Sequence, residues 1–230
     1  MKAMILAAGR GERLRPLTDT VPKPLAEVAG KPLIVYHIEA LAALGIKQIV
    51  INHAWLGHKI EQSLGDGSRW GVELLYSAET LALETAGGIK KALPLLGYDP
   101  FLVINGDLFI DNLPTIQGQS LCVAEIERLL DKKQAYLWLV DNPPQHPDGD
   151  FALKGNSVSP DGEARLTFSG IAIYRPELFA DAPDGRSALA PLLRQKMQDG
   201  LVAGEHFQSY WCDVGTLDRL TTLNQRMANK

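Results

Sequence analysis

The sequence predicts an α/β protein with a mostly parallel central sheet, flanking helices and antiparallel additions, folded as a single domain over residues 1–230. Short apolar runs with β-propensity alternate with segments of helical periodicity, which is the order of βαβ units. A later apolar run, 166–174, lies between short loops rather than helices, which indicates antiparallel strands. A chain of 230 residues is also long enough to bury a substantial core.

Local signals place the expected elements in order. Pro32 suits a first helical position and Gly45 lies where a helix should stop, so the segment between them is expected to be helical. Buried strands are expected where apolar residues run together. The predicted strands are 4–6, 48–52, 101–105 and 166–174, and the predicted helices are 32–44, 54–64, 186–197 and 216–227.

Composition narrows the class of protein. A net charge of −4, with 46% hydrophobic and 22% charged residues, argues against broad binding to nucleic acid or to anionic membranes. The first apolar run is only a few residues long and leads into an arginine-rich loop, so we expect no signal peptide or membrane span. The two cysteines, Cys122 and Cys212, are too few for a disulfide framework, and a cytoplasmic protein is expected.

The segment after the first strand has the composition of a phosphate-binding loop. Gly9 and Gly11 can adopt the positive φ values that turn successive N–H groups toward an anion. Arg10, Arg13 and Arg15 add charge-assisted donors beside these groups. The loop therefore predicts a ligand that carries several phosphates.

A lysine between two prolines strengthens this interpretation. Pro22 and Pro24 restrict the backbone around Lys23, which suits a cation held toward a phosphate. Two better-known glycine motifs do not fit. A dinucleotide fingerprint needs a third glycine where Leu14 stands, and a Walker A loop needs Gly-Lys-Ser/Thr over 14–16.

The pattern Leu6-Ala-Ala-Gly-x-Gly-x-Arg13, followed by Pro22-Lys-Pro24, resembles the signature of the sugar-nucleotide pyrophosphorylases, which transfer a nucleotide to a sugar 1-phosphate. The resemblance continues through the segments 84–88, 103–107, 149–151, 168–170 and 211–215. It implies a Rossmann-like nucleotidyltransferase fold in which the N-terminal half binds the nucleotide and the C-terminal half binds the sugar phosphate. The resemblance also implies Mg²⁺ as cofactor, because hard phosphate and carboxylate oxygens match that ion.

The resemblance assigns roles to the phosphate loop. Arg13 is expected to bind the departing β- and γ-phosphates, and Lys23 the region of the α-phosphate, where charge grows as the new bond forms. Both are the candidate catalytic residues. The expected nucleotide-binding residues are Ala8, Gly9, Gly11, Glu12, Arg13, Lys23, Glu79 and Gly87.

Two aspartates are the candidate metal ligands. Asp107 follows a buried strand that breaks at Gly106, and the resemblance makes Asp213 the second ligand. Taken singly, each aspartate could instead be a turn former or an N-cap, and Asp213 with Thr216 fits capping well. No general base is expected, because a phosphate monoester, with its second pKa at about 6, is already an ionised nucleophile near neutral pH.

The identity of the base and of the sugar is inferred from similarities of short segments to particular members of the family. Glu84 stands where the family usually has glycine, which resembles the members that act on N-acetylmuramate 1-phosphate; Glu84 could instead simply begin a helix and favour its dipole. The segments 51–56 and 139–143 point to the same short members, which use UTP in peptidoglycan recycling. Another sugar or choline phosphate, or a non-catalytic nucleotide-binding regulator, is the alternative.

Sugar contacts are expected where hydroxyls would meet paired donors and acceptors. Asp141 is one candidate for such a contact, although it could equally cap a proline-rich turn. The segment 161–166 lacks the Glu-Lys pair by which longer relatives hold the sugar phosphate, and Lys154 and Arg165 are the candidate replacements. The expected substrate-binding residues are Asn105, Asp141, Gly149, Asp150 and Ser169. A monomer or small homo-oligomer without a further repeat domain is expected.

Overall fold

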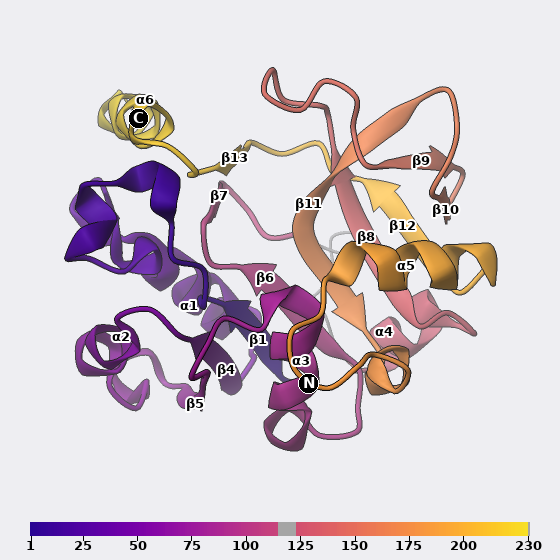
Figure 1. Ribbon diagram of the computed structural model, residues 1–230, viewed down its shortest axis with the longest axis horizontal. Helices are drawn as coiled ribbons and strands as arrows, with labels where there is room; N and C mark the ends of the chain where they lie inside the picture. Colours follow the sequence, from indigo (N-terminus) through magenta and orange to yellow (C-terminus); the bar gives the residue numbers. More distant parts are fainter. Residues whose placement is uncertain (115–122, 230) are drawn as a thin grey trace.

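A computed structural model describes residues 1–114 and 123–229, and these residues form a sheet covered by helices on both faces (Figure 1). The sheet has nine strands, in the order β5-β4-β1-β6-β11-β8-β12-β10-β9. Their bounds are β1 Ala3–Leu6, β4 Gln48–His53, β5 Glu73–Ala78, β6 Phe101–Asn105, β8 Ala135–Val140, β9 Phe151–Lys154, β10 Ser157–Ser159, β11 Arg165–Tyr174 and β12 Val202–His206. The α/β class expected from the sequence is confirmed.

The half of the sheet formed by β5, β4, β1 and β6 is wholly parallel. In its register Leu6 lies beside Asn52 on one side and Asn105 on the other. Since the carboxyl ends of parallel strands meet at one edge, the residues that follow these strands share that edge. The expected strands 4–6, 48–52 and 101–105 are all present, each within one residue of its predicted bounds.

The other half of the sheet is built around β11, the predicted strand 166–174. It runs antiparallel to both β6 and β8, whereas β12 runs parallel to β8. The hairpin of β9 and β10 closes this half, and β9 also pairs with the start of β11. The antiparallel additions are therefore more extensive than the sequence alone indicated, because the short hairpin strands carry little periodic signal.

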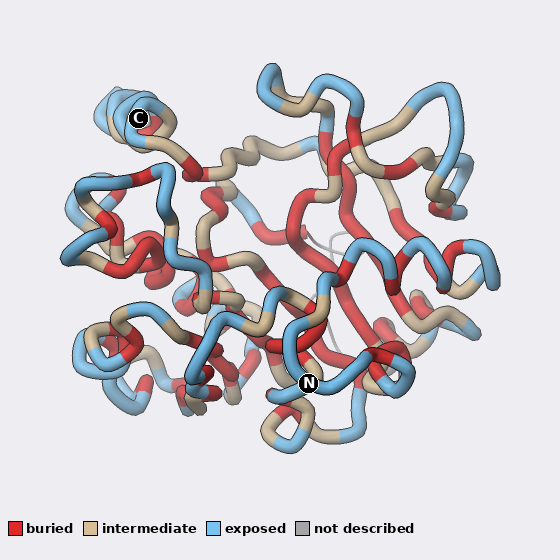
Figure 2. The backbone as a smooth tube through the Cα atoms, viewed as in Figure 1, coloured by how far each residue is buried: buried red, intermediate tan, exposed pale blue. Residues whose placement is uncertain are grey.

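An apolar cluster lies on each face of the sheet, between the strands and the helices that cover them. Figure 2 shows the buried backbone concentrated in this interior. On one face Ile38, Ile60 and Ile126 belong to α1, α2 and α4; on the other, Ile89 and Leu193 belong to α3 and α5. The helix bounds are α1 Leu33–Ala43, α2 Gly57–Leu64, α3 Glu84–Leu96, α4 Val123–Leu130, α5 Leu189–Gln198 and α6 Leu217–Ala228. Each expected helix is present, and α2 and α5 begin three residues later than predicted because the preceding residues form connections to other segments.

The C-terminal segment returns to the N-terminal half. Helix α6 contributes Leu223 to a third cluster with Val28 and Phe109, and in Figure 1 it lies beside the indigo N-terminal region. Two short two-stranded sheets accompany it in the described part of the chain: β7 Leu108–Ile110 pairs with β13 Trp211–Asp213, and β2 Glu27–Val28 pairs with β3 Lys31–Pro32. This return brings residues from the two ends of the sequence to one edge of the sheet.

Two remaining expectations concern cysteines and membranes. Cys122 lies outside the described residues, and Cys212 is a free, partly buried thiol whose pKa is raised because burial disfavours the thiolate. Within 1–114 and 123–229, no helix has both the length and the apolar character needed to cross a bilayer.

Candidate active site

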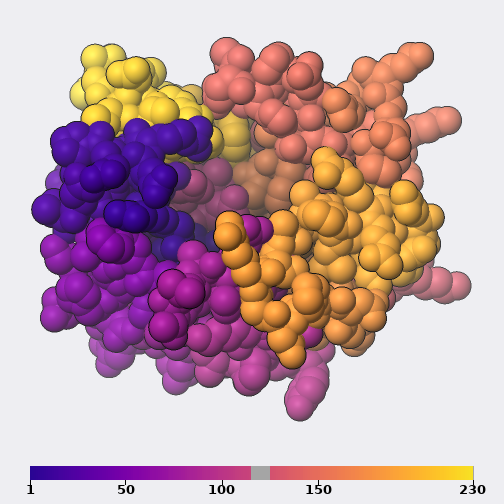
Figure 3. All heavy atoms as spheres, viewed as in Figure 1, coloured from indigo at the N-terminus to yellow at the C-terminus, as the bar shows by residue number. Residues whose placement is uncertain are grey.

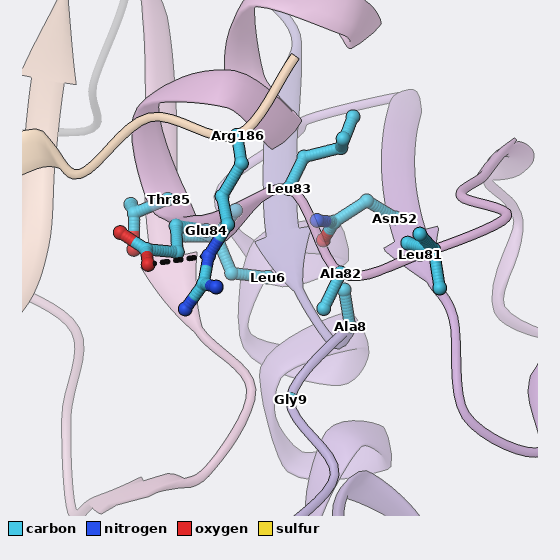
Figure 4. A pocket seen from close by; sticks show the side chains of 10 residues that line it. All are labelled: Leu6, Ala8, Gly9, Asn52, Leu81, Ala82, Leu83, Glu84, Thr85 and Arg186. Atoms are coloured by element: carbon cyan, nitrogen blue, oxygen red, sulfur yellow. Dashed lines mark hydrogen bonds and ion pairs between the residues drawn. The ribbon is translucent and has the colours of Figure 1, made fainter.

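A cavity of about 720 Å³ opens beyond the carboxyl ends of β1 and β4 (Figure 4). Figure 3 shows the surface hollowed between the indigo N-terminal segment and the orange segment that precedes α5. A smaller cavity of about 170 Å³ adjoins it and shares Leu6, Gly9 and Thr85 with it. The large cavity is lined by Leu6, Ala8, Gly9, Asn52, Leu81, Ala82, Leu83, Glu84, Thr85 and Arg186, and the small one adds Ala7, Gly11, Lys23, Pro24, Asn105 and Asp107.

A buried polar chain forms the floor of the large cavity. Asn52 accepts a hydrogen bond from the Ala7 N–H at 2.9 Å and donates to Glu79 Oε1 at 2.7 Å. Glu79 Oε2 in turn accepts from the Leu83 N–H at 2.8 Å. Both carboxylate oxygens of Glu79 are thus used within the protein, and its contact with a nucleotide stays a prediction. Sequence analysis missed Asn52, although a polar residue near the end of an apolar strand was a usable signal.

The phosphate loop folds tightly onto the lysine expected to face the nucleotide. Gly11 has φ +68°, and a methyl group there would lie 3.0 Å from Lys23 Cβ and 3.1 Å from Thr18 Cγ2. The Thr18 hydroxyl donates to the Gly11 carbonyl at 2.8 Å. Glu12 is exposed, with its carboxylate 3.9 Å from Arg10. Glycine is therefore required at position 11 by both backbone conformation and space.

Trp55, just before α2, and Lys59, within α2, both contact the same loop. The Trp55 indole N–H donates to the Thr18 carbonyl at 3.0 Å, and the Lys59 ammonium donates to the Thr20 carbonyl at 2.6 Å. The Arg10 guanidinium lies 4.5 Å from the centre of the Trp55 ring. These contacts stabilise the loop by hydrogen bonds and a cation–π interaction.

The two candidate metal ligands lie side by side: Asp107 is in the turn that precedes β7, and Asp213 is the last residue of β13. Pairing of β7 with β13 places Asp213 opposite Leu108, and the Val214 N–H donates to the Asp107 carbonyl at 2.8 Å. Asp107 forms an ion pair with Lys23, whose side chain is only 11% exposed. Asp213 Oδ2 accepts from Arg219 at 2.7 Å, whereas its buried Oδ1 has no hydrogen-bond partner among the described residues.

This arrangement suits a hard divalent cation that takes part of its coordination from the substrates. No cluster of three or more His, Cys, Asp or Glu side chains that could hold a metal occurs within the described ranges. Two carboxylates, one with an unpartnered oxygen, are nevertheless what Mg²⁺ uses when phosphate oxygens and waters complete its octahedron. Asp107 and Asp213 would hold the ion.

Arg13 reaches the same place from the phosphate loop. A methyl group on Gly215 would lie 3.0 Å from Nη2 of Arg13 and 2.9 Å from Asp213 Oδ1. Arg13 itself is exposed and donates no hydrogen bond to another residue in the described part of the chain. Its guanidinium is therefore available to an anion.

The segment before α5 clamps the start of α3. The Ala86 and Gly87 N–H groups donate to the Ser187 carbonyl at 3.0 and 3.1 Å, and the Ser187 N–H donates to the Leu83 carbonyl at 2.9 Å. A Cβ atom on Gly87 would collide with the Gly185 carbonyl. The backbone N–H of Gly87 is therefore engaged by the protein, and its expected nucleotide contact stays a prediction.

An ion pair crosses the mouth of the large cavity. Glu84 is the first residue of α3, as the helix-start alternative predicted, and its Oε1 lies 2.7 Å from Arg186 Nε (Figure 4). The Arg186 side chain is 76% exposed. Sequence analysis did not single out Arg186, because it placed that residue at the start of the helix 186–197, where a lone arginine carries no motif.

On the sugar side, Asn105 and the middle of β11 lie together. A methyl group on Gly170, which has φ +80°, would lie 2.6 Å from Asn105 Nδ2. Ser169 is buried, and its hydroxyl accepts from the Ile171 N–H at 3.1 Å. The Ser169 carbonyl accepts from the Trp211 indole at 2.8 Å. These contacts lie where the pairing of β11 with β8 shifts register, so an irregular strand places Ser169 near Asn105.

Of the five residues predicted to contact the sugar, Asn105 lines the small cavity, whereas Ser169, Asp141, Gly149 and Asp150 line neither. Asp150 accepts from the Phe168 N–H at 2.8 Å and lies 3.0 Å from His146, and the preceding Gly149 forms a turn with φ +62°. Asp141 is 86% exposed, lies 2.9 Å from His206 Nε2, and borders a separate hollow of about 360 Å³. Their sugar contacts stay predictions. Arg165 lines another surface hollow, of about 580 Å³, and Lys154 is exposed at the end of β9.

A buried histidine lies behind the carboxylates. His37 is 1% exposed, and burial lowers its pKa to about 4, although the Leu108 backbone and the Asp107 charge act in the opposite direction. The imidazole is consequently neutral at neutral pH. His37 is therefore a residue of the core.

The parallel strands, the glycine loop at their carboxyl ends, and the two adjacent aspartates together define a nucleotidyltransferase. Residues 2–136 match the nucleotidyl transferase family, and the chain belongs to that family.

Relatives of known name span nearly the whole chain. The N-acetylmuramate alpha-1-phosphate uridylyltransferase of Neisseria meningitidis serogroup B is 55% identical over 96% of this chain and 95% of the relative. The protein of the same name from Caulobacter vibrioides is 35% identical over 98% of this chain and 96% of its own length. A UTP–glucose-1-phosphate uridylyltransferase of Synechocystis is 42% identical over 81% of this chain and 52% of its own.

Solved structures confirm the fold. A Bacillus anthracis protein assigned as a glucose-1-phosphate thymidylyltransferase superposes with a TM-score of 0.83 at 20% identity, over 100% of this chain and 96% of its own. HddC from Yersinia pseudotuberculosis, complexed with GMP-PN, gives a TM-score of 0.77 at 21% identity, over 98% of this chain and 99% of its own. The expected Rossmann-like nucleotidyltransferase fold is thus confirmed.

Proposed function

We propose that this protein is a Mg²⁺-dependent uridylyltransferase that converts UTP and N-acetylmuramate 1-phosphate into UDP-N-acetylmuramate and pyrophosphate, as a step of peptidoglycan recycling. The observation that carries the chemistry is the convergence of Lys23, Asp107, Asp213 and Arg13 next to a cavity at the carboxyl ends of parallel strands. The choice of base and sugar is supported by the relative with 55% identity over 96% of the chain.

The residues divide the reaction between them. One oxygen of the sugar phosphate attacks the α-phosphorus of UTP, and pyrophosphate leaves in line. Lys23 lies in the small cavity, where it would neutralise charge that grows on the α-phosphate, and Arg13 would hold the departing phosphates. Asp107 and Asp213 would hold Mg²⁺, which supplies charge neutralisation and a template when bound. Both substrates are anions, so positioning and charge compensation supply most of the acceleration.

The two cavities suit two substrates. The large cavity, with its backbone-rich wall of Leu81–Leu83, would take the uracil and ribose, and Arg186 and Glu84 would close over them. Asn105 and Ser169 lie on the side from which the sugar phosphate would approach. A cytoplasmic protein that is a monomer or small homo-oligomer accords with this function.

Pyrophosphate release provides the test. With UTP and Mg²⁺, the rate with N-acetylmuramate 1-phosphate should exceed the rates with N-acetylglucosamine, glucose and mannose 1-phosphates. A preference for glucose or mannose 1-phosphate would retain the reaction class and overturn the sugar. Binding of UTP without pyrophosphate release from any sugar phosphate would overturn the catalytic assignment and favour a nucleotide-binding regulator.

A further inference from the structure

Arg219, in the first turn of α6, is a cation to which the proposed function gives no role. Its Nη1 donates to Asp213 Oδ2 at 2.7 Å, and its side chain is only 19% exposed. The Thr216 hydroxyl accepts from both the backbone N–H and Nε of Arg219, at 3.3 and 3.4 Å. The guanidinium is therefore held at the site by several contacts.

Arg219 and Arg13 converge on one point from opposite ends of the sequence. A methyl group on Gly215 would lie 2.5 Å from Nη2 of Arg219 and 3.0 Å from Nη2 of Arg13. The buried, unpartnered Asp213 Oδ1 is 2.9 Å from the same point. Two guanidinium groups thus approach a single carboxylate, and only a glycine leaves the space between them open.

The two aspartates are paired in the same manner. Lys23 neutralises Asp107, and Arg219 neutralises Asp213. A divalent cation that binds to both carboxylates would compete with both side-chain cations. Arg219 would then lie beside Arg13 without its own counter-charge, and two adjacent guanidinium groups are stabilised by an anion with several oxygens, which they can bind in a bidentate manner.

We propose that Arg219 is a second polyphosphate-binding arginine, which exchanges Asp213 for the β- and γ-phosphates of the nucleotide and, with Arg13, holds the pyrophosphate that leaves. The inference rests on the proposed function for the reaction in which this contact is used. The ligand chemistry itself, two linked phosphates, is tested without any sugar.

Calorimetric titration of pyrophosphate in the presence of Mg²⁺ tests the proposal directly. Relative to the wild type, Arg219→Ala should weaken pyrophosphate binding by about ten- to a hundredfold, which corresponds to one or two charge-assisted hydrogen bonds. Arg219→Lys should recover part of the loss, because it keeps the charge but not the planar fork. Pyrophosphate binding by Arg219→Ala at wild-type strength, or no binding by the wild type at millimolar pyrophosphate, would overturn the proposal.

Arg226 provides a matched control on the same helix. Its Nη1 lies 3.0 Å from Asp111, and its guanidinium lies 3.5 Å from the centre of the Tyr210 ring. Arg226→Ala should lower the melting temperature and leave pyrophosphate affinity within about twofold of the wild type, because α6 loses a structural contact only. An equal loss of affinity in both variants would mean that charge on α6 acts at long range, and would overturn a specific site at Arg219.

Electron paramagnetic resonance can measure Mn²⁺ binding in the absence of nucleotide. This measurement distinguishes two roles for Arg219, binding of phosphate and orientation of the Asp213 carboxylate. If Arg219 competes with the metal for Asp213, Arg219→Gln should bind Mn²⁺ as tightly as the wild type or more tightly. A lower Mn²⁺ affinity would show that Arg219 acts by orienting the carboxylate, and would overturn the exchange. Neither titration contains UTP or sugar, so an error in the proposed substrate would leave both results interpretable.

Discussion

The two sides of the sheet edge use their polar side chains differently. On the nucleotide side, Asn52 and Glu79 are buried and bonded to each other, and they leave the loop backbone and Lys23 to face the cavities. On the sugar side, Asp150 is bonded to the backbone of β11, and Asp141 is 86% exposed. A nucleotide therefore meets a preformed surface, whereas the sugar contacts we expect depend on groups that either have other partners or point into solvent.

This difference explains why the nucleotide side has a recognisable sequence motif and the sugar side does not. Phosphates are bound by backbone N–H groups and cations, which require glycines at fixed spacing and leave a recognisable pattern. Sugar hydroxyls accept many combinations of polar groups, so no spacing is imposed.

The largest effect should follow substitution on the nucleotide side. Asp107→Asn should lower the rate of pyrophosphate release from UTP by about 10²- to 10³-fold, because Lys23 loses its partner and the metal loses a charged ligand. Asp19→Asn, which breaks an exposed ion pair of 2.7 Å with Arg15, is the matched control and should keep the wild-type rate. If Asp107→Asn kept a tenth of the wild-type activity, Asp107 would not be a required metal ligand.

Substitution of one asparagine on each side should show how much its hydrogen bonds contribute to the stability of the fold. Asn52→Ala should lower the free energy of unfolding by about 3 kcal/mol or more, because it leaves Glu79 Oε1 and the Ala7 N–H, both buried, without their hydrogen-bond partner. Asn142→Ala removes the hydrogen bonds of its side-chain amide to the Arg165 and Pro147 carbonyls, at 2.9 and 3.0 Å, and the one that its Oδ1 accepts from the Thr167 hydroxyl at 2.9 Å. Because Asn142 is partly exposed and all three lost partners are uncharged, the loss should be smaller, about 1 to 2 kcal/mol. Urea unfolding measures both. Equal losses would contradict the difference between the sides.

Acid sensitivity should also reside on the nucleotide side. The pKa of His37 is lowered to about 4 in the folded protein. Between that pKa and the value of about 6.5 in an unfolded chain, the unfolded state binds more protons, so stability is lost as the pH falls through this window, by up to about 3 kcal/mol. Urea unfolding at pH 7 and pH 4.5 should show this loss in the wild type. In His37→Leu the loss should be smaller; an unchanged pH dependence would exclude His37 as its source.

The smallest effect is expected at the exposed sugar-side carboxylate. Asp141→Ala should raise the KM for the sugar 1-phosphate by about two- to tenfold, the loss of a single solvent-exposed hydrogen bond, and leave the KM for UTP unchanged. Steady-state kinetics with each substrate varied in turn measures the two constants. A change in the KM for UTP alone would show that Asp141 acts on the nucleotide and would contradict its assignment to the sugar side.

The sequence predicted the parallel half of the sheet well, because apolar strands 48–52 and 101–105 alternate with periodic helices. It did not predict the hairpin of β9 and β10, whose short strands are defined by pairing rather than by periodicity. At the site, Lys23 and Asp107 carried motifs, whereas Arg219 became visible only when α6 returned to the phosphate loop. Contacts that depend on such chain reversals leave no local signal.

Strand β11 belongs to both sides of the site. Its C-terminal part pairs with β6, the neighbour of β1 in the parallel half of the sheet, and its first residues pair with β9, which follows Asp150. The span between the two expected substrate sites is therefore set largely by one strand, which shifts register between Phe168 and Ala172. Much of the entropy of bringing nucleophile and phosphorus together would already be lost when the chain folds. Any closure over the substrates would fall to surface segments such as 185–187, so release of product could proceed without movement of the sheet.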